Sequence, residues 1–305
     1  MTRLSDALAR ANKFKPDDDN ALQERSSLAW NFDAAERIPE SLPAPHPPSQ
    51  PFTAAAEPPG ELPGEFATPR ALETRFSDAD RLKVVMGPDA DPAVVEQYRR
   101  LAAVLHHAQR ERRARSVMIA SAAPAEGKTL TSTNLALTLS GSYKRRVLLV
   151  DADLRRPGIH TIFNLPNAVG LVDALTQPRG SRLPAQAVSP TLWVLTAGRP
   201  SPDPMGALVS DAMKDLLTEA METFDWVVVD TPPLAILSDA NLLAGMIDTA
   251  LLVVGARSTP YPLVQRAIAA IGAPKILGVV LNRAERSELS DGYAYSANRE
   301  RYRAN

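Results

Sequence analysis

The sequence of 305 residues contains no cysteine, few aromatic residues and no long apolar run. The absence of cysteine excludes a disulfide framework and a metal site built on thiolates. No stretch approaches the roughly 20 apolar residues that span a bilayer, so we expect no direct membrane span. The N-terminal segment MTRLSDALARANKFKP also lacks the apolar core of a signal peptide. We therefore expect a soluble, cytoplasmic protein.

Neither sign of charge dominates, because 34 Lys and Arg residues stand against 35 Asp and Glu residues, with a formal net charge of −1. A nucleic-acid-binding surface is usually marked by a basic excess. The one locally basic run, RERRARS at residues 110–116, is explained by a solvated helix end, where cations are favourable. The charge pattern thus predicts no nucleic-acid partner.

Proline is abundant, with 27 residues, and much of it lies between residues 39 and 69 without hydrophobic periodicity. Such a stretch buries too little apolar surface to offset the entropy of ordering. We predict four regions: a short amphipathic helix at 1–14, a disordered linker at 15–80, a folded domain at 81–285 and a flexible tail at 286–305. An isolated helix as short as the first gains little by folding alone, so it suggests a docking partner.

The stretch VMIASAAPAEGKTLTSTNLALTL, residues 117–139, combines the signals of a phosphate-binding loop. An apolar strand is expected at 117–120 and a helix at 129–139, which places Gly127 and Lys128 at the strand-to-helix junction. Backbone N–H groups and the helix dipole favour anions at such a junction. The lysine side chain can reach phosphates, and the Thr129 hydroxyl can hold Mg²⁺.

The match to G-x-x-x-x-G-K-[ST] is incomplete, because Ala122 occupies the position of the first glycine. The turn itself reads Pro124-Ala125-Glu126 instead of a run of small residues. A Gly-Lys-Thr helix start without a ligand is therefore the alternative at this point.

Acidic residues follow two further apolar runs. Residues 146–150 lead into Asp151 and Asp153, and residues 226–229 lead into Asp230. Carboxylates at the carboxyl ends of parallel strands face the crevice in which α/β sheets bind ligands. Beside a triphosphate they suit Mg²⁺ handling or acceptance of a hydroxyl proton. Solvent-exposed acids that cap a helix are the alternative for the first pair.

Strand and helix patterns alternate through the remainder of the domain. This alternation predicts an α/β fold of the P-loop NTPase type, with a mostly parallel sheet and helices on both faces. Helices are expected at 92–112, 170–175, 204–223, 239–246 and 260–271, and further strands at 191–198, 250–255 and 276–282.

The polar C-terminal segment contains Tyr293, Tyr295 and Tyr302, three of the six tyrosines of the chain. Aromatic residues are scarce in disordered segments, so this cluster suggests a function. A tail that docks on its own domain is the alternative.

Taken in order, the motifs SAAPAEGKT, LLVDADLRRP and WVVVDTPP, followed by LGVVLNR and the tyrosine-bearing tail, resemble those of the bacterial tyrosine kinases of exopolysaccharide and capsule synthesis. The resemblance implies a P-loop ATPase fold, the cofactors ATP and Mg²⁺, and autophosphorylation of C-terminal tyrosines. It also implies the freestanding cytoplasmic branch, in which a membrane polysaccharide co-polymerase is a separate partner chain that recruits the kinase to the cytoplasmic membrane.

The resemblance assigns roles to individual residues. Lys128 is expected to neutralise phosphate charge, Asp151 to accept the tyrosine proton, and Asp153 to complete the catalytic set. The implied cofactor-binding residues are Ala125, Glu126, Gly127, Lys128, Thr129, Leu130, Asn282 and Arg283. The implied Mg²⁺ ligands are Thr129, Asp153 and Asp230, and the implied phosphoacceptors are Tyr293, Tyr295 and Tyr302.

The chain departs from the family at two places. Ala125 stands where glycine is common, and at positive φ alanine costs about 1 kcal/mol relative to glycine. Glu96 and Arg99 fit an oligomerisation motif, E-x-x-R-x-x-R, whose last arginine is Ala102 here; the implied partner is nevertheless a homo-oligomer.

The leading hypothesis is an ATP- and Mg²⁺-dependent tyrosine autokinase that phosphorylates a neighbouring subunit and regulates polysaccharide chain length and export. The alternatives are an ATP-hydrolysing switch and a non-catalytic adaptor of the co-polymerase. Phosphotyrosine separates the first from the other two, and phosphate release separates those from each other.

Overall fold

The computed structural model describes residues 76, 83–85, 90–178, 180–234 and 240–284. The predicted helix at 1–14, nearly all of the predicted linker at 15–80 and the predicted tail at 286–305 lie outside the described residues. The fold below is that of the domain expected at 81–285.

The described elements alternate along the chain as expected. In order they are α3 (Pro92–Arg112), β1 (Ser116–Ser121), α4 (Lys128–Gly141), β2 (Val147–Asp151), α5 (Ile159–Ile162), α6 (Leu171–Leu175), β3 (Gln186–Ser189), β4 (Leu192–Leu195), α7 (Pro204–Leu208), α8 (Asp211–Thr223), β5 (Trp226–Asp230), α9 (Ala240–Gly245), β6 (Thr249–Gly255), α10 (Tyr261–Ile271), a 3₁₀ turn η2 (Ala273–Lys275) and β7 (Ile276–Asn282).

The strands form one sheet in the order β3-β4-β2-β5-β1-β6-β7. All neighbouring pairs are parallel except β3 and β4, which are antiparallel. Strand β5 lies between β1 and β2, although four helices and two strands separate it from β2 in the chain. The predicted α/β fold with a mostly parallel sheet is confirmed.

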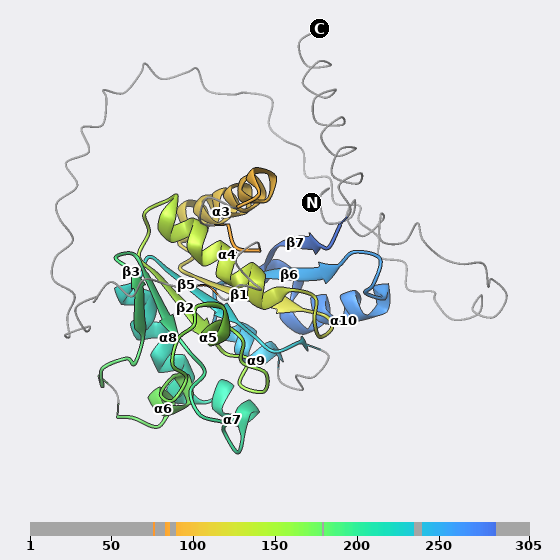
Figure 1. Cartoon of the computed structure of the whole chain (residues 1–305). Coiled ribbons are helices and arrows are strands. Elements are labelled where there is room, and N and C mark those ends of the chain that lie inside the picture. The colour runs from red at the N-terminus through yellow and green to blue at the C-terminus, as the bar shows by residue number, and fades with distance from the viewer. Residues whose placement is uncertain (1–75, 77–82, 86–89, 179, 235–239, 285–305) are drawn as a thin grey trace, which may run out of the picture.

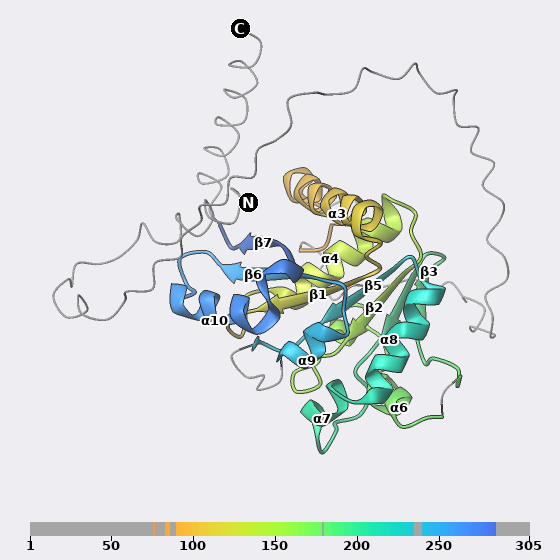
Figure 2. The same cartoon turned by 180° about the vertical axis from the view of Figure 1, so that it is seen from behind.

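Helices cover both faces of the sheet. Figures 1 and 2 show α3 and α4 on one face and α8, α9 and α10 on the other. Each face has its own apolar core, because successive strand residues point to opposite sides. In β1, Val117 and Ile119 join the core under α3 and α4, whereas Met118 and Ala120 join the core under α8 and α10.

Helix α3 begins and ends at signals that the sequence contains. The Asp91 side chain accepts a hydrogen bond from Ala93 N at 2.9 Å, and Pro92 occupies the first helical position. The helix ends where Arg113 adopts a left-handed conformation with φ 55°. No described helix is both long and apolar enough to cross a bilayer.

The structure corrects two sequence-based expectations. The helix predicted at 204–223 is two helices, because Ser210 accepts a hydrogen bond from Met213 N at 3.2 Å and so starts a new helix at Asp211. The stretch between β2 and β4, for which only the helix at 170–175 is expected, also contains α5 and the edge strand β3. Both elements have only four residues, too few for periodicity to reveal them.

Candidate functional site

The predicted phosphate-binding loop lies between the end of β1 at Ser121 and the start of α4 at Lys128. Ala125 has φ 62° and Gly127 has φ 90°. Residue 125 thus has the positive φ at which alanine costs about 1 kcal/mol relative to glycine. Other contacts of the loop must hold this residue in place.

Gly127 is tightly enclosed by the end of the last strand. A Cβ at residue 127 would lie 2.1 Å from Nδ2 of Asn282. The same amide nitrogen donates a hydrogen bond to the backbone oxygen of Glu126 at 2.8 Å. Asn282 thus lies against the loop, and Arg283 follows it with φ 60° and an exposed side chain.

Gly127→Ala is expected to weaken nucleotide binding about tenfold or more, because the strain of a left-handed alanine adds to the displacement of Asn282. Titration with a fluorescent ADP analogue measures the effect. Gly272→Ala is the matched control, since Gly272 has φ 89° but no atom within 4 Å of an added Cβ. Equal nucleotide affinity in the two variants would contradict the assignment of the loop.

Three buried carboxylates meet beside this loop. The order of the sheet places β5 between β1 and β2, and the register pairs Asp230 with Ile119 on one side and with Asp151 on the other. The side chains of Asp151 and Asp230 are 0% exposed, and that of Asp153 is 4% exposed. This burial excludes the alternative of solvent-exposed capping acids.

Lys128 is the cation at the centre of this cluster. Its Nζ lies 2.7 Å from Oδ2 of Asp153 and 3.9 Å from Oδ1 of Asp230. Burial lowers the pKa of Lys128, but the charges of Asp230 and Asp153 outweigh this effect and raise the pKa above its usual value. The ammonium group therefore stays charged.

Asp151 lies deeper than Asp153 and does not pair directly with the lysine. Its Oδ2 accepts hydrogen bonds from Gly158 N at 3.1 Å and Ile159 N at 3.0 Å, at the start of α5. Its Oδ1 accepts none from the part of the chain that the structure describes. Burial, reinforced by the charge of Asp230, raises the pKa of Asp151 to about 8.

Asp230 also has unused acceptor capacity. Neither of its carboxylate oxygens has a partner with good hydrogen-bond geometry among the described residues, although the Thr129 hydroxyl lies near enough to lower the pKa of Asp230. Burial raises the pKa of Asp230 to about 6, although the charge of Lys128 opposes this rise. The cluster therefore holds more negative charge than its single ammonium group balances.

This surplus fits a divalent cation. Buried carboxylate oxygens without donors are the ligands that Mg²⁺ prefers. No three His, Asp or Glu residues among those described are arranged to hold a metal by themselves. That agrees with the usual Mg²⁺ site beside a nucleotide, which takes one or two protein ligands and completes its shell with phosphates and water.

The other predicted residues occupy the first turn of α4. Thr129 Oγ1 lies 3.5 Å from Lys128 Nζ, and the partly buried Leu130 packs against the core under α3. Glu126 differs from expectation in its surroundings, since its carboxylate points into hydrogen bonds with protein donors. The predicted phosphoacceptors Tyr293, Tyr295 and Tyr302 lie outside the described residues.

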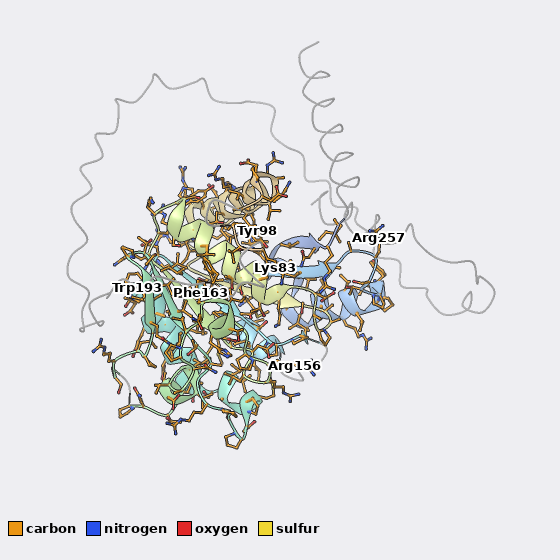
Figure 3. The ribbon with its side chains drawn as sticks, viewed as in Figure 1. Lys83, Tyr98, Arg156, Phe163, Trp193 and Arg257 are labelled. Atoms are coloured by element: carbon orange, nitrogen blue, oxygen red, sulfur yellow. The ribbon has the colours of Figure 1, made fainter. Side chains whose placement is uncertain are left out.

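Two exposed arginines lie on the side of the sheet toward which the strands point. Figure 3 labels Arg156, which follows Asp153, and Arg257, in the turn between β6 and α10. The backbone N of Arg156 donates to Oδ1 of Asp153 at 3.1 Å. The backbone of Arg156 is thus joined to the acidic cluster through Asp153.

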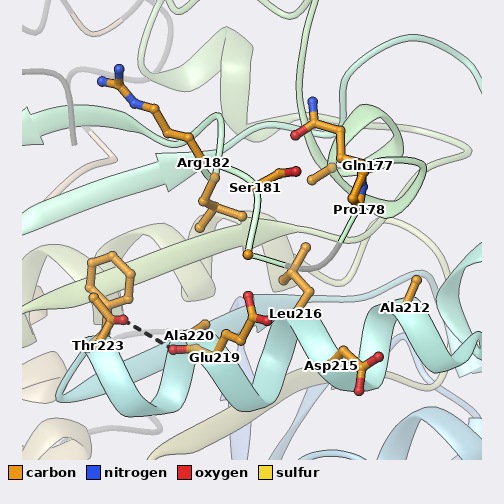
Figure 4. A pocket seen from close by; sticks show the side chains of 14 residues that line it. Gln177, Pro178, Ser181, Arg182, Ala212, Asp215, Leu216, Glu219, Ala220 and Thr223 are labelled. Atoms are coloured by element: carbon orange, nitrogen blue, oxygen red, sulfur yellow. Dashed lines mark hydrogen bonds between the residues drawn. The ribbon is translucent and has the colours of Figure 1, made fainter. Parts of the chain in front are cut away.

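A separate hollow of about 400 Å³ lies between α8 and the segment after α6 (Figure 4). Leu216 and Phe224 provide apolar lining, and Arg182, Asp215 and Glu219 provide charge. None of the predicted site residues lines it. This pocket is therefore distinct from the predicted site, which is identified by the convergence of charged side chains.

No protein-family model matches the chain. Among curated proteins, the tyrosine-protein kinase YwqD of Bacillus subtilis is 37% identical over 210 residues, which cover 68% of this chain and 88% of that kinase. The succinoglycan biosynthesis transport protein ExoP of Rhizobium meliloti is 36% identical over 198 residues, 62% of this chain and 25% of that protein.

Comparison with solved structures also finds similar proteins. The chimerical protein CapA2B2 matches with a TM-score of 0.61 and 29% identity, over 69% of this chain and 92% of that chain. The identity and coverage of YwqD are high enough to show common family membership. With the loop, the central lysine and the converging aspartates in place, the chain belongs to the bacterial tyrosine kinase family.

Proposed function

We propose that this chain is an ATP- and Mg²⁺-dependent protein-tyrosine autokinase that transfers the γ-phosphoryl group to C-terminal tyrosines of a neighbouring subunit. The observation that carries the proposal is the placement of Lys128 among three buried carboxylates at the end of a phosphate-binding loop. Membership of the family supports it.

Lys128 would act on the phosphates as a positive charge in a buried setting. Its raised pKa keeps it protonated, and its side chain is only 10% exposed, so little water screens it. The ion pair with Asp153 holds the ammonium group in place before a nucleotide binds. Preorganised charge of this kind stabilises the transition state of phosphoryl transfer.

Asp151 would accept the proton of the tyrosine hydroxyl as the tyrosine oxygen attacks the γ-phosphorus and ADP leaves. A general base works best when its pKa lies near the working pH, and burial brings the pKa of Asp151 to about 8. The hydrogen bonds to Oδ2 orient the carboxyl group, and Oδ1 is left to receive the proton.

Thr129, Asp153 and Asp230 are the residues that would hold Mg²⁺, by hydroxyl and carboxylate oxygens. When bound, the ion would neutralise charge on the β- and γ-phosphates. Asp230, with two oxygens that accept no hydrogen bond from the described residues, is suited to order the ion through water. We assign ATP and Mg²⁺ as the cofactors on this basis.

The proposed acceptors Tyr293, Tyr295 and Tyr302 follow the end of β7 closely in the sequence. From Asn282 to Tyr293 about 11 residues span up to roughly 35 Å when extended. A tail of this length can enter the site of a neighbouring copy. We therefore propose phosphorylation in trans within a homo-oligomer.

A mixing experiment tests phosphorylation in trans. A Lys128→Met chain supplies a tail but no activity, and a chain lacking residues 285–305 supplies activity but no tail. Phosphotyrosine on the Lys128→Met tail is expected when the two are mixed with Mg-ATP, and neither chain alone is expected to acquire it. If the mixture stays unmodified while the intact chain is phosphorylated, transfer occurs within one chain.

The proposed role is control of exopolysaccharide chain length and export. The likeness to ExoP, a succinoglycan biosynthesis transport protein, supports it. We further propose that a membrane polysaccharide co-polymerase recruits this cytoplasmic chain to the inner face of the cytoplasmic membrane, with residues 1–14 as the docking segment. Loss of membrane association on deletion of residues 1–14 would support this arrangement.

A further inference from the structure

We propose that Glu126 is a positioning residue: its buried carboxylate fastens the phosphate-binding loop to the turn after β6 and so sets the shape of the loop for a nucleotide. The inference rests on the proposed nucleotide-dependent function and deepens it. It also brings in Thr259, which no sequence motif marks.

The Glu126 side chain joins two parts of the chain. Its Oε2 accepts a hydrogen bond from Ala123 N within the loop at 2.7 Å. Its Oε1 accepts one from Gly255 N at 3.2 Å and another from the Thr259 hydroxyl. Gly255 ends β6, and Thr259 lies just before α10. One carboxylate therefore ties the loop after β1 to the turn after β6.

Because Glu126 is buried, its carboxylate depends on these hydrogen-bond donors. Glu126 is only 4% exposed, and a buried carboxylate requires donors on its oxygens. Its backbone oxygen is also engaged, by Nδ2 of Asn282 at 2.8 Å. The residue is thus held through both its side chain and its backbone, by the ends of β6 and β7.

The position of Glu126 in the loop explains what the tie does. It lies between Ala125, at φ 62°, and Gly127, at φ 90°, so two strained or special backbone positions flank it. Without the tie, an alanine would return to the more favourable right-handed region. The carboxylate would also be free to approach the phosphates and repel them. The hydrogen bonds of Glu126 prevent both the change at Ala125 and this repulsion. They therefore affect nucleotide affinity more than the rate of phosphoryl transfer.

Thr259 gives the cleanest test, because it lies outside the loop. Thr259→Val removes the hydroxyl donor at nearly constant shape, and Thr259→Ser retains it. Titration of the full-length chain with a fluorescent ADP analogue and Mg²⁺ is expected to give a dissociation constant about three- to tenfold higher for Thr259→Val, from the lost charge-assisted hydrogen bond. The value for Thr259→Ser is expected within about twofold of the original.

Glu126→Gln provides the second variant. It is expected to raise the dissociation constant by about tenfold or more, because the amide is uncharged and its nitrogen cannot accept the hydrogen bond that one carboxylate oxygen accepts. In the double variant the two effects are expected to be less than additive, since both break the same contact. At saturating ATP the turnover of Thr259→Val, which lies outside the predicted site residues, is expected to stay within about twofold of the original.

Several outcomes would overturn the inference. It fails if Thr259→Val and Thr259→Ser bind nucleotide equally well. It also fails if the effects of the Glu126 and Thr259 substitutions on nucleotide binding are additive, or if turnover falls while nucleotide affinity is unchanged. Thr259→Val and Thr259→Ser still decide it if Glu126→Gln does not fold. The proposed kinase function is judged separately, because a chain that binds nucleotide through this tie but leaves its tyrosines unmodified would refute the kinase and support the inference.

Discussion

Replacing Asp151 by Asn is expected to abolish phosphoryl transfer and, above neutral pH, to make the folded chain more stable. The loss of the proton acceptor should lower the rate by about 10²- to 10⁴-fold. The gain in stability arises because Asp151 is fully buried beside Asp230 and interacts with it unfavourably. A residue placed for catalysis commonly costs stability in this way.

The raised pKa of Asp151 determines how its contribution to stability changes with pH. The pKa of Asp151 is raised to about 8 in the folded chain, against about 3.9 for an unfolded aspartate. The folded chain therefore binds the proton more tightly, so this residue's favourable contribution is complete below about pH 4 and is lost as the pH rises through about 8. Asn cannot ionise, so the variant should be free of this loss.

Thermal unfolding between pH 5 and pH 9 measures the effect. The melting temperature of Asp151→Asn should exceed that of the original chain by only a small margin at pH 5, and by several degrees more at pH 9. Glu222→Gln, which neutralises an exposed acid on α8, is the control and should show no such divergence. Equal melting temperatures at pH 9, or substantial remaining kinase activity, would contradict the assigned environment of Asp151.

Replacing Lys128 by Met is expected to lower both phosphoryl transfer and stability. Transfer should fall by about 10³-fold or more, because charge at the phosphates supplies much of the catalysis. Stability should fall by about 3–5 kcal/mol, the usual cost of leaving a buried ion pair without its cation. The carboxylates of Asp153 and Asp230 would lose the only ammonium group within 4.0 Å among the described residues.

The loss of stability should itself depend on pH. The charge of Lys128 lowers the pKa of Asp230, so its removal raises that pKa further and favours the protonated folded chain. The deficit should therefore shrink toward pH 5 and grow toward pH 8. Lys128→Arg retains the charge but not the geometry of a point donor; it should retain most of the stability and little activity. Equal loss of stability in both variants would argue against the ion-pair explanation.

Much of the fold was predictable because its signals are local. The loop, the helix of α4 and the aspartates at the ends of β2 and β5 depend on periodicity and on residues at the ends of strands. Ala125 stands where glycine is common in the family, and its positive φ explains that preference. The family resemblance agreed with these signals, and the curated relatives support it.

What could not be predicted depends on contacts between distant residues. Local patterns do not reveal that β5 inserts between β1 and β2, which brings Asp151 beside Asp230. The sequence groups Asp153 with Asp151 at the end of one apolar run, but β2 ends at Asp151. Asp153 lies in the following turn, where its Oδ1 accepts a hydrogen bond from Arg156 N. The contact of Glu126 with Thr259 joins residues 133 positions apart.

The most direct test is peptide mass spectrometry of the chain purified from cells, after co-expression with the proposed membrane co-polymerase and addition of Mg-ATP. The account predicts phosphate on one or more of Tyr293, Tyr295 and Tyr302. This phosphate should be absent from the Lys128→Met chain and from a chain with all three tyrosines replaced by Phe. An unmodified tail in the original chain, or a tail equally phosphorylated in Lys128→Met, would contradict self-catalysed tyrosine phosphorylation.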